Sequence, residues 1–213
     1  MVNVRIVFSK TGRAKFISHL DLMRTMTRAV RRAQIPLWYT EGFNRHPYIT
    51  FAAPLSLGYE GLHETMDLRL EEPMDMEELV SRFRNVMPEG LTVLSAAESV
   101  YKPGQLAFAR YSLRFNCEDF TLRELLSQSE IEVEKRTKKG GVKVLDIKPT
   151  LINPVLSPAD DGCCLEVTLP NGSESNVNPQ LILSALQKAT GDDTLTMRVT
   201  RLELYAADGN PFR

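Results

Sequence analysis

The alternation of apolar and polar residues predicts a mixed set of strands and helices in the first half of the chain. Residues 4–8 alternate in this way, which is typical of a half-buried strand. Apolar residues spaced three or four apart then predict a helix from Ser18 to Gln34, with Ser18 as its N-cap and Pro36 just beyond its end. Residues 36–39 and 48–51 are predicted to be extended and joined by a turn over 41–47. A further strand over 66–70, a helix opened by Asp75 and a closing strand from Leu91 complete this half.

The second half repeats this order of elements. The predicted elements are a strand over 111–115, a short helix capped by Thr121 with Glu124, a hairpin within 131–147, a strand over 163–169, a helix started by Asn178-Pro179, and a strand over 195–205 whose alternation changes phase near Arg201. Two βαββαβ orders in succession predict the α+β class, as tandem ferredoxin-like domains with antiparallel sheets. We place these domains at residues 1–100 and 106–213, with the junction at Lys102-Pro103-Gly104.

Composition narrows the class of protein. The 213 residues are 43% hydrophobic and 25% charged, with a net charge of −1, as expected of a globular protein. No apolar run approaches the roughly 20 residues that a membrane helix needs. The first eight residues alternate like a strand and lack the apolar block of a signal peptide. We therefore expect a cytoplasmic protein with no membrane contact.

The cysteines give no sign of a metal site. Cys117, Cys163 and Cys164 include no Cys-x-x-Cys pair, and their number is odd, which fits small core residues in a reducing compartment. We predict no metal and no cofactor. The chain also lacks the phosphate-loop, dinucleotide-binding, zinc-protease and nucleophile-elbow motifs, so it supports no named enzyme class. We expect a non-catalytic accessory module.

Positive charge is concentrated in one part of the chain. Residues 10–49 contain eight Lys or Arg against only Asp21 and Glu41, a local charge of +6 in a chain of net charge −1. Such a local excess of positive charge favours a polyanionic partner. A second basic segment, residues 135–148, has a charge of +5 and a Lys138-Lys139-Gly140-Gly141 turn, whereas residues 59–87 are acidic.

These segments supply the candidate site. Arginines three or four apart share one side of the predicted helix, and their planar guanidinium groups suit phosphate oxygens. Trp38, Tyr39 and Phe43 offer rings on which bases could stack. The predicted nucleic-acid-binding residues are Lys10, Lys15, His19, Arg24, Arg28, Arg31, Arg32, Asn44, Arg45, His46, Lys138 and Lys139.

Three functions remain open from these residues. The first is an RNA-binding accessory protein. The second is a metal-independent ribonuclease that uses His19 or His46, since histidine can exchange protons near neutral pH. The third is a protein–protein adaptor that docks through the acidic segment and binds no nucleic acid. For each histidine, a structural role within the turn or helix is the alternative.

One dense stretch also resembles a known family. It contains Phe16-Ile-Ser-His-Leu-Asp-Leu-Met-Arg24, then Gly42-Phe43-Asn44, His46-Pro47 and the segment from Phe51 to Gly58. These motifs resemble the radical-SAM-associated bacterial domain of unknown function, although Arg45 stands where that family usually has proline. The resemblance implies a separate radical-SAM enzyme as partner. The chain itself has no Cys-x-x-x-Cys-x-x-Cys motif with which to hold that enzyme's cluster. The order of elements is also similar to that of the CRISPR repeat-processing endonucleases, which are tandem ferredoxin-like RNA binders.

Overall fold

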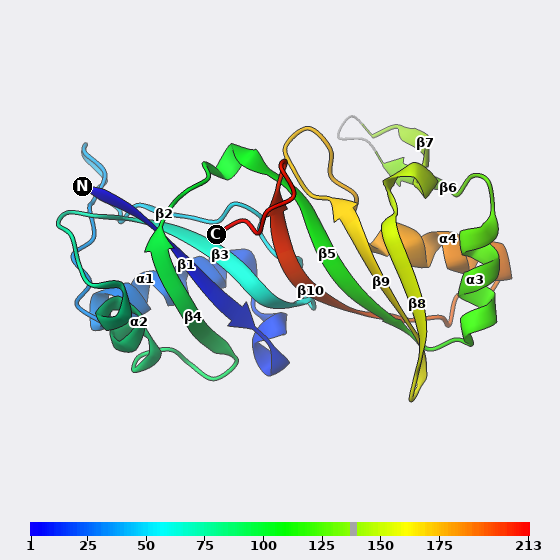
Figure 1. Ribbon diagram of the computed structural model, residues 1–213, viewed down its shortest axis with the longest axis horizontal. Helices are drawn as coiled ribbons and strands as arrows, with labels where there is room; N and C mark the ends of the chain where they lie inside the picture. Colours follow the sequence, from blue (N-terminus) through cyan, green and yellow to red (C-terminus); the bar gives the residue numbers. More distant parts are fainter. Residues whose placement is uncertain (137–139) are drawn as a thin grey trace. The chain divides into compact units, whose positions relative to one another are not determined.

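The first of two compact units is built on an antiparallel sheet. The computed structural model describes residues 1–136 and 140–213 (Figure 1). It divides the chain into unit 1, residues 1–107 with 201–213, and unit 2, residues 108–200. The elements of unit 1 are β1 (Val2–Lys10), the 3₁₀ helix η1 (Gly12–Phe16), α1 (His19–Arg32), β2 (Ile49–Thr50), β3 (Glu60–Leu70), α2 (Met76–Arg84), β4 (Leu91–Glu98), the 3₁₀ turn η2 (Pro103–Gln105) and part of β10 (Met197–Ala206).

Strand pairing in unit 1 follows the order β4-β1-β3, with the short β2 also paired to β3, and each of these three pairs is antiparallel. The C-terminal part of β10 also lies next to β3. Alternate residues of β1 and β3 bury apolar side chains against one side of α1 and of α2. This core contains Val4, Ile6, Phe8, Met66, Leu68, Leu70, Leu22, Met26, Ala29, Val30, Leu79, Val80 and Phe83.

Unit 2 contains β5 (Leu106–Phe115, of which residues 108–115 belong here), α3 (Asp119–Ser127), β6 (Glu132–Arg136), β7 (Val142–Asp146), the 3₁₀ turn η3 (Lys148–Thr150), β8 (Ile152–Ala159), β9 (Gly162–Pro170), α4 (Gln180–Thr190) and the start of β10. Its sheet has the order β10-β5-β9-β8, while β6 and β7 form a separate two-stranded hairpin. The buried cross-strand pairs Leu113–Leu165 and Tyr111–Val167 mark the core face.

The α+β class is therefore confirmed: four α-helices accompany mostly antiparallel strands in the part of the chain that the structure describes. The strand order is β4-β1-β3-β2 in unit 1 and β10-β5-β9-β8 in unit 2. The sequence prediction missed β8, and it assigned residues 201–213 to the second domain. These residues group with unit 1, where the Phe212 ring stacks on Tyr101 at 5.9 Å and packs over the Arg5 guanidinium.

Helix ends follow the predicted local signals in most places. Asp75 caps α2, since its carboxylate accepts the backbone N–H of Glu78 at 2.8 Å. The Asn178 side chain accepts from Gln180 N at the start of α4, and Gly191 ends that helix with a left-handed φ of 68°. The exception is α3, which starts at Asp119, so the predicted cap Thr121 lies inside its first turn. Within the described residues, every helix is too short or too polar to cross a bilayer.

Candidate nucleic-acid interface

The start of α1 is set by a network around Ser18. The Ser18 hydroxyl oxygen accepts the backbone N–H of Asp21 at 3.1 Å and donates to the Asp21 carboxylate at 2.7 Å. Asp21 also accepts from Arg24 at 3.3 Å. The hydrogen bond from Ser18 lowers the pKa of Asp21, and the charges of Arg24 and Arg28 act in the same direction. The predicted N-cap is confirmed, and it presents a carboxylate at the positive end of the helix.

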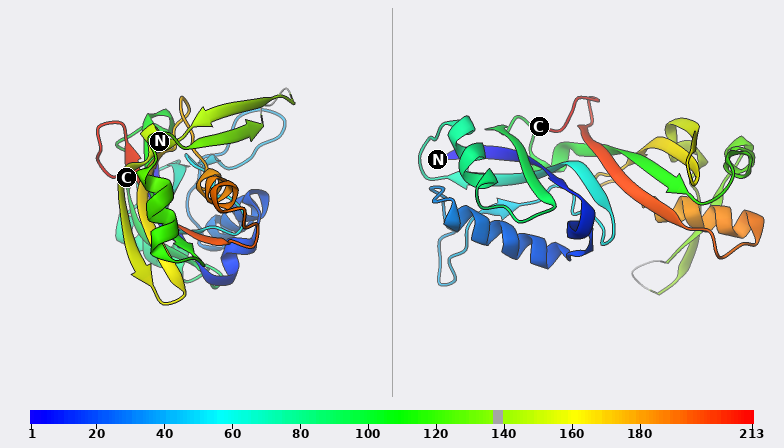
Figure 2. Two further views of the ribbon diagram at one scale, coloured as in Figure 1. Left: turned by 90° about the vertical axis from the view of Figure 1, so that its right-hand side faces the viewer. Right: turned by 90° about the horizontal axis from the view of Figure 1, so that it is seen from below.

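The outward side of α1 carries three arginines, which we call the arginine face: Arg24, Arg28 and Arg31. All three are exposed, while Leu22, Met26, Ala29 and Val30 on the opposite side are buried. The spacing of four and three residues places the arginines in one row. In the right-hand view of Figure 2, α1 lies along the outside of its unit. Among the described residues, Asp21 is the only carboxylate in an ion pair with this row.

Arg32 does not continue the arginine face. Its guanidinium donates to the backbone carbonyl of Val86, which follows α2. The bond joins the end of α1 to the end of α2, and it satisfies a carbonyl beyond the last turn of a helix. Arg32 therefore has a structural partner that the sequence pattern did not reveal.

Lys10 is buried rather than on the predicted surface. Its residue is 1% exposed, and its ammonium donates to the carbonyls of Lys15 and Ile17 at 3.4 and 3.3 Å. Burial lowers the pKa of Lys10, although the negative charge of Glu64 acts in the opposite direction and raises it. The side chain holds the chain that leads from η1 into α1, so it is not available to a ligand at the surface.

Lys15 is half-buried at the edge of the same region. Its ammonium lies 3.2 Å from Glu60 Oε1, and that oxygen also accepts the backbone N–H of Gly12. The pair fixes η1 against the start of β3. Beside it, the Phe16 ring is 67% exposed, with the Lys15 ammonium 5.4 Å from the ring centroid. Phe16 was not among the rings expected at the surface, because aromatic residues are usually part of the core.

The loop over residues 40–47 carries Asn44, Arg45 and His46, all exposed. It is closed by Thr40, whose N–H donates to the His46 carbonyl at 2.9 Å and whose hydroxyl oxygen accepts the His46 N–H at 3.2 Å. His46 Nδ1 lies 3.1 Å from the same hydroxyl and 3.2 Å from the Asn44 carbonyl. Gly42 has a φ of 115°, which accounts for glycine in this turn. The loop thus presents Phe43 and Arg45 on a closed turn.

The two candidate histidines, His19 and His46, have separate surroundings. His19, at the start of α1, packs edge-on against the Phe51 ring at 5.4 Å. His46 contacts Thr40 and Asn44, as described above, and no described hydrogen bond or ring contact joins it to His19. Of the predicted stacking rings, Trp38 lies beside Tyr48 and Tyr39 packs against the core, while Phe43 is fully exposed. Lys138 and Lys139 lie outside the described residues.

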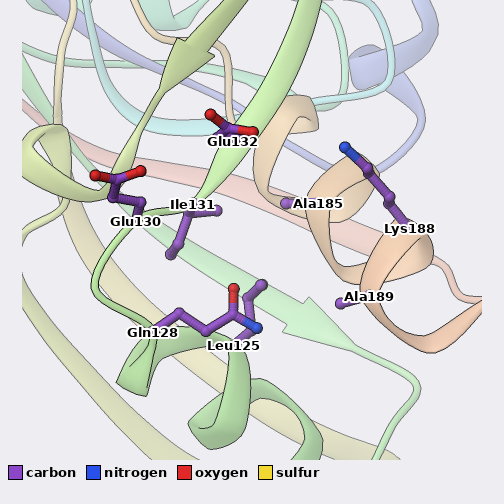
Figure 3. Close-up of a pocket in the computed structure, with 8 residues that line it drawn as sticks. All are labelled: Leu125, Gln128, Glu130, Ile131, Glu132, Ala185, Lys188 and Ala189. Atoms are coloured by element: carbon purple, nitrogen blue, oxygen red, sulfur yellow. The ribbon is translucent and has the colours of Figure 1, made fainter.

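A separate pocket lies in unit 2, at the ends of α3 and α4 next to the start of β6 (Figure 3). Glu130, Glu132 and Lys188 are the charged residues that line its volume of about 380 Å³. None of the predicted site residues is among those that line it. In the described part of the chain, no group of three or more His, Cys, Asp or Glu is placed to hold a metal ion.

The family of the chain follows from a comparison with family models. The model described as "Uncharacterized protein conserved in bacteria (DUF2344)" matches residues 3–179. The chain belongs to this family. The matched range includes α1, the loop over residues 40–47 and the hairpin of β6 and β7, so the DUF2344 match covers the arginine face and the loop together. A search of curated proteins found no match.

Proposed function

We propose that this protein is a cytoplasmic accessory protein that binds RNA through the arginine face of α1. The observation that carries the proposal is the row of Arg24, Arg28 and Arg31, exposed on one side of a helix whose other side is buried. Guanidinium groups in such a row can each bind phosphate oxygens in a bidentate manner. Only Arg24 in this row has an acidic partner among the described residues.

Neighbouring groups add to this surface. Arg13 on η1 and Arg45 in the loop over residues 40–47 are exposed cations. The exposed rings of Phe16 and Phe43 provide faces on which unpaired bases can stack. Single-stranded RNA binders commonly combine these two features, cations for the backbone and rings for the bases. Lys138 and Lys139 are included as phosphate-binding residues on the basis of the sequence alone.

The experiment compares two double variants that remove the same charge. Arg28→Gln with Arg31→Gln removes two members of the arginine face, and Arg123→Gln with Arg198→Gln removes two exposed arginines of unit 2. Binding of a labelled single-stranded RNA is measured by fluorescence anisotropy over a series of salt concentrations. Each phosphate contact contributes about −0.7 to the slope of log K against log salt. We therefore expect the first variant to have a slope less steep by about 1.4 and the second to match the wild type.

Equal slopes and affinities in the two double variants would remove the arginine face from the site. Thermal unfolding of both variants serves as the control for folding, since all four arginines are exposed. A cleaved probe, with cleavage abolished in the His19→Ala or His46→Ala variant, would instead support the ribonuclease. Neither histidine is required for RNA binding itself in this proposal.

The proposal includes a separate radical-SAM enzyme, to which the bound RNA is presented. It rests on the resemblance of residues 16–58 to the radical-SAM-associated domain. Size-exclusion chromatography of the protein with a radical-SAM enzyme from the same bacterium tests it, with and without RNA. A complex that forms only with RNA supports presentation. A complex that forms without RNA, from a protein that binds no RNA, supports the adaptor instead.

A further inference from the structure

A second candidate site lies on the other side of the sheet of unit 1. Successive residues of a strand point to opposite faces, so Asn3 and Arg69 face away from the core formed by Val4 and Leu68 with the helices. A pocket of about 440 Å³ opens on this side, beside the segment that connects β4 to η2. Its size lies in the range of small-molecule sites. Its lining includes Asn3, Tyr48, Arg69, Ser99, Tyr101 and Lys102.

Arg69 is held in a fixed position in this pocket. Its guanidinium carbon lies 4.6 Å from the centroid of the Tyr48 ring and 5.0 Å from that of Trp38. Its Nε donates to Asn3 Oδ1 at 3.1 Å. These contacts orient the group and leave the terminal nitrogens for other acceptors, because no described carboxylate pairs with Arg69. A guanidinium held in this way is prepared for bidentate binding of an anion.

The charge of the pocket is positive. Asp67 is its only acidic lining residue, and its carboxylate is already paired with buried Arg5, with Arg5 Nε 2.7 Å from Oδ1 and Nη2 2.9 Å from Oδ2. Arg69 and Lys102 then contribute two positive charges. Among the described residues, neither is in an ion pair. Two cations match the charge of one phosphate monoester, which is close to −2 at neutral pH.

A buried hydroxyl completes the polar lining. The Oγ atom of Ser99 is inaccessible to solvent and has no hydrogen-bond partner in the protein. Buried polar atoms are normally paired, so this unpaired hydroxyl is unusual for a residue that lines a pocket. The rings of Tyr48 and Tyr101 supply aromatic walls. The Tyr101 hydroxyl donates to Asp208 at 2.8 Å, which fixes that ring in place.

We propose that this pocket binds a nucleoside monophosphate, either free or as the terminal nucleotide of an RNA chain. The phosphate is bound by Arg69 and Lys102, and the base packs against the tyrosine rings. Inorganic phosphate would leave most of the volume empty. The site lies on the face of the sheet opposite α1, so it is independent of the arginine face.

Isothermal titration calorimetry of the full chain with AMP and with UMP tests the proposal, with adenosine and inorganic phosphate as reference ligands. We expect the nucleotides to bind at least about tenfold more tightly than either reference, because each reference lacks one half of the contacts. The Lys102→Gln variant should lose about tenfold in affinity. Lys188→Gln, in the pocket of unit 2, is the matched control and should bind like the wild type.

Arg69→Gln should lose at least as much as Lys102→Gln, and thermal unfolding checks that it remains folded. Lys102 is exposed, so its variant tests the pocket even if Arg69→Gln does not fold. Absence of binding by both nucleotides, equal affinity for inorganic phosphate, or an unchanged Lys102→Gln would each overturn the proposal. Arg28→Gln with Arg31→Gln should leave AMP affinity unchanged, which separates this site from the proposed RNA surface.

The source of the nucleotide is resolved with short RNAs. An RNA with a 5′-phosphate that competes with AMP, where the same RNA with a 5′-hydroxyl does not, identifies a chain end as a ligand of the pocket. AMP binding without such competition identifies the free nucleotide. Competition by both RNAs would show that the pocket does not recognise the 5′-phosphate, and it would overturn the assignment of Arg69 and Lys102 to a phosphate.

Discussion

Arg201 and Glu64 form an ion pair inside unit 1, with Arg201 Nε 2.8 Å from Glu64 Oε1. Arg201 Nη2 donates to the second carboxylate oxygen and also to the Ala53 carbonyl at 2.6 Å. Their side chains are 3% and 5% exposed. The ion pair joins β10 to β3, and the bond to Ala53 joins β10 to the segment that precedes β3. Because both charges are removed from water, each depends on the other for its solvation.

Breaking this pair should destabilise the protein strongly. Glu64→Gln leaves the Arg201 guanidinium buried without its counter-charge, and we expect a loss of about 3–5 kcal/mol in the free energy of unfolding. Urea denaturation measures it. Arg123→Gln breaks the exposed pair with Asp119 and should cost less than about 1 kcal/mol. A Glu64→Gln variant as stable as Arg123→Gln would show that the buried pair contributes little.

At the end of α1, the backbone of Gln34 is strained. Gln34 has a φ of 52°, and Gln34 N and Ile35 N donate to the carbonyls of Arg31 and Val30. These two bonds form a Schellman motif, in which glycine is favoured at the left-handed position. Gln34→Gly should therefore stabilise the protein by about 1 kcal/mol. Gln34→Ala keeps the Cβ atom and should give no gain. Thermal unfolding that ranks the alanine variant level with glycine would contradict this account.

Local signals were sufficient for much of the fold. Ser18, Asp75 and Asn178 act over three residues or fewer, and each begins a helix where the sequence predicted one. The missed strand β8 contains Pro154 and Pro158, which favour a loop in sequence analysis. It lies at the edge of its sheet, where proline is tolerated because one side of the strand makes no ladder hydrogen bonds.

The candidate site was harder to predict, since charge alone does not place a side chain on the surface. Lys10 is buried beside Glu64 and Arg201, which are far from it in the sequence. Arg32 bonds to a carbonyl beyond α2. By contrast, helical periodicity was enough to place Arg24, Arg28 and Arg31 on one outward side. The positions of Lys10 and Arg32 depend on tertiary contacts, and a periodic pattern carries no information about those.

A glycine is required at position 162, because the backbone there passes very close to the backbone of β5. It follows the two-residue turn between β8 and β9 with a φ of 139°, and a Cβ atom there would lie 2.1 Å from the Phe115 carbonyl oxygen. Gly162→Ala should therefore cost about 3 kcal/mol or more. Gly104→Ala, where nothing lies within 4 Å of the added atom, should change stability by less than about 0.5 kcal/mol. Similar urea midpoints for the two variants would rule out the predicted clash.

Cys163 should make the protein less stable at alkaline pH. It is fully buried on β9, and burial, followed by the neighbouring Cys117 at 3.9 Å, raises the pKa of its thiol to about 12. Between the pKa of the unfolded thiol, near 9, and 12, the folded state holds a proton that the unfolded state has lost. Stability must then fall as pH rises through this window.

The Cys163→Ala variant isolates this contribution. Urea unfolding of both proteins is measured at intervals from pH 8 to about 10.5, a range that begins below the unfolded thiol's pKa. The variant loses the packing of the thiol at every pH, but its stability should decline less steeply than that of the wild type above about pH 9, because no buried thiol remains to titrate. Parallel curves would mean that the folded thiol ionises as readily as the unfolded one. In that case Cys163 would also react rapidly with a thiol reagent in the native protein, whereas we expect it to react more slowly than Cys164.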